Sequence, residues 1–192
     1  ELRAFWERYY VPSNATLIIV GAVKHDEARR LAEKYFGWIP EYPKPAGVDV
    51  NEPGLEGVKK ITIEQENAPA PLAGLLFKTI AASHEDDIPL TMLAKILGQG
   101  RSSRLYRELV TKRQLAVNVV AEAFALEQEG VFGMGAVMAP FGADANQVMA
   151  ILRSEVKRLQ QEPVSERELM KARNGMLKEI VVGTLTVESK AS

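Results

Sequence analysis

The stretch LGQGRSSRLYRELVTKRQLAV, residues Leu97 to Val117, places two helix ends and the start of a strand next to one another. It follows an apolar run with helical spacing, made of Leu90, Leu93, Ala94 and Leu97. Gly98, the nearer of two glycines, is well placed to end that helix in a left-handed conformation, and Ser102 or Ser103 then caps a shorter helix. We therefore expect the rest of the chain to pack around this stretch.

The shorter helix is predicted to have one apolar side and one basic side. Leu105 and Leu109 lie one turn apart and should face the core. The basic cluster consists of Arg101, Arg104, Arg107, Lys112 and Arg113. Glu108 is the only acidic residue within it. The chain then becomes extended, and the apolar residues expected to alternate along one face are Leu115, Val117, Val119 and Ala121.

A loop rich in glycine and serine also suggests a phosphate cradle. Such a loop follows a strand, opens a helix and carries Lys and then Ser or Thr after its last glycine. Here a helix precedes the loop, and Arg101 follows Gly100. The spacing therefore disfavours a phosphate-binding loop.

Elsewhere in the chain, apolar runs of period two predict strands and runs of period 3.6 predict helices. The predicted strands are Leu17 to Val20, Val58 to Glu64, Leu72 to Ile80, Leu115 to Ala123 and Val131 to Ala139. The second and third should pair as a hairpin, and so should the last two. The predicted helices are Leu2 to Tyr10, His25 or Asp26 to Phe36, Asp87 to Leu97, Asp144 to Gln160, and one opened by the capping box Ser165-x-x-Glu168.

This order predicts an α+β fold, a largely antiparallel sheet with helices packed on one face, including the helix that ends at Phe36. Pro40 to Gly57 should be a surface connection without regular structure, because it holds four prolines and three glycines. With 192 residues, of which 46% are hydrophobic, the chain is long enough for a single domain with a sizeable core. We interpret residues 1–192 as that domain, cut from a longer protein.

Charge and composition exclude several classes of function. The 24 basic residues against 25 acidic ones leave no surplus to neutralise nucleic-acid phosphates. No apolar run reaches the ~18 residues that suggest a membrane span. Cysteine is absent, which excludes disulfides, thiolate metal sites and thiol nucleophiles.

No catalytic or metal-binding residue is predicted within this segment. The two histidines, His25 and His84, are 59 positions apart, and neither has a second histidine four residues away. Paired carboxylates such as Asp86 and Asp87 fall at helix starts, where negative charge offsets the helix dipole. No serine has both a histidine and an acid at suggestive positions.

GRSSRLYRELV followed by QLAV resembles the C-terminal domain of the pitrilysin, insulysin and mitochondrial-processing-peptidase family of zinc metallopeptidases. The likeness covers nearly the whole chain, since it extends to FWERYYVPSNATLIIVGAV, ARRLAEKYFGWIP and HEDDIPLTMLAKILGQG. The residues that carry the family motif are Gly98, Gly100, Arg101, Ser102, Ser103, Arg104, Leu105 and Tyr106.

The resemblance implies a non-catalytic C-terminal domain that forms one wall of a chamber enclosing peptide substrates. The zinc and the general base, held by an H-x-x-E-H motif, would then lie in an N-terminal domain absent from this segment. The resemblance also suggests a bacterial and periplasmic protein. Two alternatives are a catalytically inactive structural core subunit of the same family, as in some respiratory complexes, and an unrelated α+β interaction module.

The chain departs from the family pattern at two positions. In many relatives an arginine and, seven residues later, a tyrosine hold the substrate peptide near the zinc; here these positions are Val110 and Val117. Valine can neither donate to a peptide carbonyl nor stabilise an oxyanion, so we expect this domain to lack the clamp. The resemblance suggests that a partner subunit supplies the pair in a heterodimer, with a homodimer as the alternative. In the alternative interpretation the two valines are simply core residues. The substrate is then held by an edge strand of the N-terminal domain.

Overall fold

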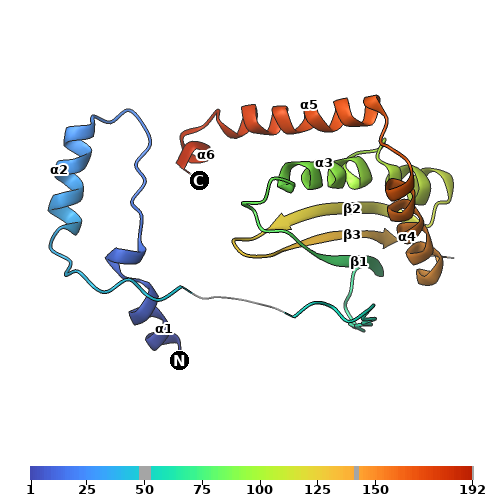
Figure 1. Ribbon diagram of the computed structural model, residues 1–192, viewed down its shortest axis with the longest axis horizontal. Coiled ribbons are helices and arrows are strands. Elements are labelled where there is room, and N and C mark those ends of the chain that lie inside the picture. Colours follow the sequence, from blue (N-terminus) through green and yellow to red (C-terminus); the bar gives the residue numbers. More distant parts are fainter. Residues whose placement is uncertain (48–52, 141–142, 192) are drawn as a thin grey trace. The chain divides into compact units, whose positions relative to one another are not determined.

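The computed structural model describes residues 1–47, 53–140 and 143–191 (Figure 1). They form two units, one of Glu1–Gly54 with Glu179–Ser192 and one of Leu55–Lys178. The single domain predicted for residues 1–192 stays a prediction. Residues 48–52, in the predicted irregular connection, lie outside the described part.

The first unit holds short helices: α1 (Leu2–Tyr9), a 3-10 turn η1 (Pro12–Asn14), α2 (His25–Phe36) and α6 (Val187–Ala191). The predictions of α1 and α2 are confirmed. Asp26 and Glu27 lie in the first turn of α2, where negative charge offsets the helix dipole. Within α1 and its C-cap residue Tyr10, ring contacts join Phe5 to Tyr9 at 4.8 Å and Trp6 to Tyr10 at 6.3 Å between centroids.

One prediction for this unit is wrong. Residues 17–20 form no strand, because this run finds no partner strand among the described residues. Leu17, Ile18 and Ile19 are 48–59% exposed. The unit contains no strand in its described part, so the expectation that α2 lies on a sheet stays a prediction. Tyr35 and Phe36 are exposed.

The second unit is built on a three-stranded antiparallel sheet in the order β1-β3-β2. Its strands are β1 (Leu72–Thr79), β2 (Ala116–Ala125) and β3 (Gly130–Met138). In the register, Phe132 of β3 lies opposite Phe77 of β1 and Ala123 of β2. The three corresponding predicted strands and the hairpin of β2 with β3 are confirmed.

The predicted strand over residues 58–64, and with it the hairpin to β1, is wrong. β1 pairs with β3 instead, and its other edge carries no strand among the described residues. Without that pairing, residues 58–64 have no regular secondary structure, and Val58, Ile61 and Ile63 are 67–85% exposed. Alternation alone indicates an extended backbone and does not name its hydrogen-bonding neighbour.

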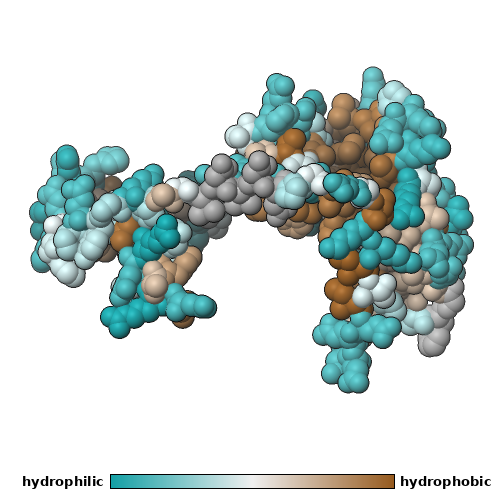
Figure 2. Space-filling model, turned by 60° about the horizontal axis from the view of Figure 1, so that its bottom comes forward, coloured by the Kyte–Doolittle hydropathy of each residue, from teal (hydrophilic) through white to brown (hydrophobic). Residues whose placement is uncertain are grey.

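Helices cover one face of the sheet, as predicted for the α+β fold (Figure 1). They are α3 (Asp87–Gly98), the π-helix η2 (Tyr106–Lys112) and α4 (Ala145–Gln161), while α5 (Glu166–Gly183) follows α4. The core lies between sheet and helices, with Leu97, Leu105, Leu109, Val119, Phe132, Met134, Val148 and Leu152 at its centre. On the opposite face Leu76, Val120 and Phe124 are exposed, and hydrophobic side chains gather there (Figure 2).

Gly98 is the last residue of α3, as predicted, but the left-handed conformation predicted for it is wrong. It has no left-handed backbone; the left-handed residue is Gly100, at φ +78°. A Cβ on Gly98 would lie 2.3 Å from the backbone nitrogen of Ala121. Glycine at position 98 therefore lets α3 approach β2 closely.

Candidate functional site

The family motif forms the turn between α3 and η2. A hydrogen bond of 3.0 Å from Ser103 N to Gly100 O closes this turn. Ser103, Arg104 and Leu105 are buried, whereas Arg101 and Ser102 are exposed. The turn thus buries its centre and leaves its first residues at the surface.

The predicted side-chain cap of the shorter helix is wrong. Ser103 Oγ is buried without a hydrogen-bond partner, and no such bond is found for the Ser102 side chain in the described part of the chain. Instead, the backbone oxygen of Ser103 accepts a hydrogen bond from Arg107 N at 3.0 Å. The burial predicted for Leu105 and Leu109 is confirmed, since both are fully buried.

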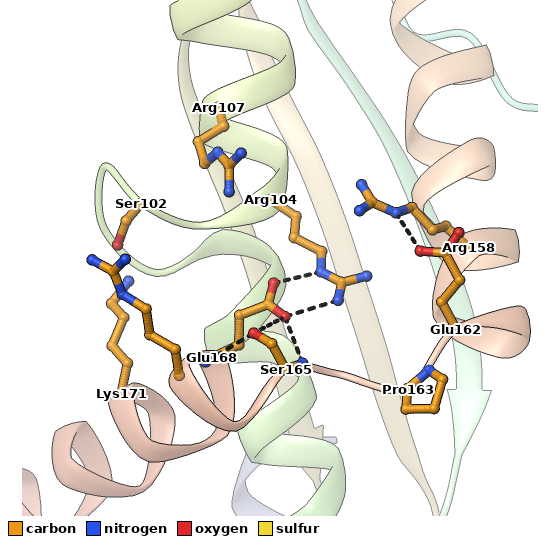
Figure 3. A pocket seen from close by; sticks show the side chains of 10 residues that line it. Ser102, Arg104, Arg107, Arg158, Glu162, Pro163, Ser165, Glu168 and Lys171 are labelled. Atoms are coloured by element: carbon orange, nitrogen blue, oxygen red, sulfur yellow. Dashed lines mark hydrogen bonds and ion pairs between the residues drawn. The ribbon is translucent and has the colours of Figure 1, made fainter.

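Arg104 joins the motif to the start of α5 through a bidentate ion pair with Glu168 (Figure 3). Its Nε donates to Glu168 Oε1 at 2.7 Å and its Nη2 to Glu168 Oε2 at 3.0 Å. Glu168 is also the acid of the predicted capping box, which is confirmed: Ser165 N and Oγ each donate to Glu168 Oε2 at 2.9 Å. One carboxylate therefore both begins α5 and neutralises the motif's buried arginine.

This arrangement lowers the pKa of Glu168 to about 2. The hydrogen bond from Arg104 is the main cause, burial opposes it, and the bonds from Ser165 add to it. The same hydrogen bond raises the pKa of Arg104. The sequence predicted Glu168 as a capping residue. It did not predict the ion pair of Glu168 with Arg104, because the two residues are 64 positions apart and no local sequence pattern links them.

The predicted basic cluster divides in the structure. Lys112 and Arg113 form ion pairs with Glu108, and the hydrogen bond from Lys112 is the main cause that lowers the pKa of Glu108. Arg104 turns inward to Glu168. Arg101 and Arg107 remain exposed. The basic residues are thus partly neutralised and do not form one continuous face.

Val110 and Val117, at the two clamp positions, have different environments. Val110 lies on η2, half-buried against the core, whereas Val117 on β2 is 55% exposed. The predicted inward alternation is wrong at Val117, because the pairing with β3 shifts register between Ala116 and Asn118. Such a bulge turns one side chain to the other face, and Val119 and Ala121 then resume the inward positions.

The stretch between the two valines is irregular. The π-helix η2 is followed by Gln114 with φ +53°, and Leu115 N donates to Leu109 O at 2.8 Å. π-helical segments are rare and are frequent at functional sites. Neither valine side chain can form a hydrogen bond with a ligand.

The histidines do not form a metal site. His25 begins α2 in the first unit, while His84 lies in the second, where Asp86 N donates to its Nδ1 at 3.1 Å. The described residues contain no group of three or more potential metal ligands. They therefore do not fit the zinc of the resembling family, and the assignment of that zinc to another domain stays a prediction. No helix of the described residues is long and apolar enough to span a bilayer.

Comparisons with known proteins agree with this geometry. Residues 1–176 match the family described as the peptidase M16 inactive domain. The zinc protease PqqE of Helicobacter pylori is 29% identical over 69% of this chain and 30% of its own length. An uncharacterized zinc protease of Bacillus subtilis, YmxG, is 25% identical over 100% of this chain and 45% of its own.

The fold agrees with a crystal structure of a protease from Helicobacter pylori, with a TM-score of 0.90 and 25% identity. That likeness covers 99% of this chain and 46% of the solved one. The chain therefore spans less than half the length of each of these relatives.

Proposed function

This chain belongs to the family of the peptidase M16 inactive domain, and we propose that it is the non-catalytic domain of a zinc metalloendopeptidase subunit. The zinc and the general base for peptide-bond hydrolysis lie in another domain of the full-length protein. Relatives named zinc proteases, more than twice as long as the part they share with this chain, support the proposal.

One observation carries the proposal: the two buried polar residues of the motif, Arg104 and Ser103, are not arranged for a reaction. Arg104 is held by Glu168, and Ser103 is buried in the turn. A nucleophile or general base needs a partner aligned to move its proton. Ser103 Oγ has no such partner among the described residues.

In the full-length protein the domain forms one wall of the peptide-enclosing chamber. The uncovered sheet face supports this role, because Leu72, Leu76, Val120 and Phe124 there are 51–76% exposed. Exposed apolar side chains that gather on one surface are typical of an interaction face. Gly133 and Gly135 lie between them on β3 and let another backbone approach.

A partner subunit completes the substrate clamp. Val110 and Val117 cannot donate hydrogen bonds, and the exposure of Val117 leaves room for a partner's side chain there. A partner that carries the arginine and the tyrosine makes the assembly a heterodimer. In the alternative, a homodimer, both copies carry the two valines and neither supplies the pair.

The experiment compares kcat/KM for an unfolded peptide in three samples. They are the full-length protein alone, with its partner, and with the partner's clamp arginine changed to alanine. Activity that needs the intact partner supports the clamp proposal. Full activity of the protein alone, unchanged by either partner, overturns it and leaves the two valines as core residues.

A further inference from the structure

A strongly basic cavity lies between the motif turn, the end of α4 and the start of α5 (Figure 3). Its volume is about 670 Å³ and it opens to solvent. Two acidic side chains line it, Glu162 and Glu168, against five basic ones: Arg104, Arg107, Arg158, Arg167 and Lys171. All of these residues belong to the second unit.

Both acids of the cavity are already engaged. Glu168 pairs with Arg104, and Glu162 Oε2 accepts from Arg158 Nε at 3.0 Å. The side chains of Arg107 and Arg167 form no hydrogen bond or ion pair within the described residues. The cavity therefore carries three more positive than negative side chains, and two arginines are free to bind.

Arg104 supplies an independent sign of a missing ligand. Its side chain is only 7% exposed, and its Nη1 is buried without a hydrogen-bond partner. A buried charged donor left unpaired is costly, so native structures rarely retain one. In Figure 3 the guanidinium lies between Glu168 and the Arg158–Glu162 pair. Burial, and after it the nearby charge of Arg158, oppose the rise in the pKa of Arg104, while the charge of Glu155 adds to that rise.

We propose that this cavity binds a ligand with a compact oxyanion group, a phosphate or a carboxylate. Arg104 Nη1 would donate to it from the floor, and Arg107 and Arg167 from the rim. Arginine forks match planar and tetrahedral oxyanions, and an anion here relieves the repulsion between Arg104 and Arg158. The site uses side-chain cations, so it differs from a glycine-rich phosphate loop, which the sequence disfavours. The proposal does not depend on the peptidase assignment.

The test is calorimetric titration of the full-length protein at fixed ionic strength. One arm uses inorganic phosphate. Two others use a D-alanine tripeptide, which resists cleavage, with a free and with an amidated carboxy terminus. Saturable binding of phosphate, of the free-acid peptide or of both supports the proposal and identifies the source. The amidated peptide should not bind.

Variants assign the binding to this cavity. Arg107→Gln and Arg167→Gln, which break no bond of the fold, should each weaken the affinity about tenfold, the loss of one charged hydrogen bond. Arg153→Gln removes an exposed arginine of α4 outside the cavity and should leave the affinity unchanged. Absence of saturable binding by both anions overturns the proposal, as does equal weakening by all three variants.

Discussion

The guanidinium of Arg104 and the carboxylate of Glu168 meet in a fork of two hydrogen bonds, 2.7 Å and 3.0 Å long, across 64 positions of sequence. Arg104 is nearly buried and Glu168 is 26% exposed. Because Glu168 also caps α5, the pair ties the motif turn to the start of that helix. The motif's arginine thus has a structural partner within its own domain.

Replacing Glu168 should destabilise the protein more than an ordinary surface change. Glu168→Gln leaves the buried Arg104 without its counter-charge, so we expect the free energy of unfolding to fall by about 3 kcal/mol. Urea denaturation measures this loss. The matched control is Glu166→Gln, one helical position into α5 and exposed, which should change stability by less than about 0.5 kcal/mol. Equal losses in the two variants would contradict the assignment.

The same pair predicts a dependence of stability on pH. The pKa of Glu168 is about 2 in the folded protein, below its ordinary value of 4.5, so folding favours the ionised form. Its stabilisation is fully present above about pH 5 and is lost as the pH falls towards 2, by about 3 kcal/mol in total.

The measurement is a pH series of urea denaturation for the native protein and for Glu168→Gln. The gap in unfolding free energy between the two should be largest near neutral pH and should close as the pH falls. A gap that stays constant down to pH 3 would show that Glu168 titrates normally.

Gly98 should tolerate no side chain. In Gly98→Ala the new Cβ would meet the Ala121 backbone, which cannot move aside cheaply, so α3 must shift from β2. We expect a loss of about 2–3 kcal/mol, as in overpacked cores. Gly183→Ala is the control, because a Cβ there meets nothing within 4 Å and alanine favours a helix. A thermal melt that separates the two variants confirms the close contact.

The two valines can be tested by restoring the missing donors. In the full-length protein without its partner, Val110→Arg combined with Val117→Tyr should raise kcat/KM about tenfold, the value of one charged hydrogen bond. Val117→Tyr should cost little stability, because the position is 55% exposed. Val110→Met with Val117→Phe is the control of similar bulk without donors. A rise in the control as well would show that bulk, and not hydrogen bonding, is responsible.

Sequence patterns predicted the elements whose signals are local. The capping box Ser165-x-x-Glu168 and the apolar spacing of Val148, Ile151 and Leu152 specify α5 and α4 by themselves. β2 and β3 were predictable because a short turn fixes their pairing. Residues 17–20 and 58–64 show the limit, since an apolar extended run says nothing about whether a neighbouring strand is in place.

The candidate site was harder to predict than the fold. The bulge that exposes Val117 depends on the register of β2 against β3. No residue near Val117 in the sequence predicts this register. The unpaired Nη1 of Arg104 likewise depends on Glu168 and Arg158, which lie on other helices. Long-range packing decides both features, so the motif indicates where the site lies but not which of its side chains remain free.

We propose that none of the described residues of this chain binds the zinc or activates the attacking water. The double variant His25→Ala with His84→Ala, in the full-length protein with its partner, is measured for bound zinc and kcat/KM. Because neither histidine lies in a ligand cluster of the described residues, we predict unchanged zinc content and kcat/KM within about twofold. Loss of the zinc, or a fall of roughly a hundredfold or more with the circular dichroism spectrum intact, would contradict the claim.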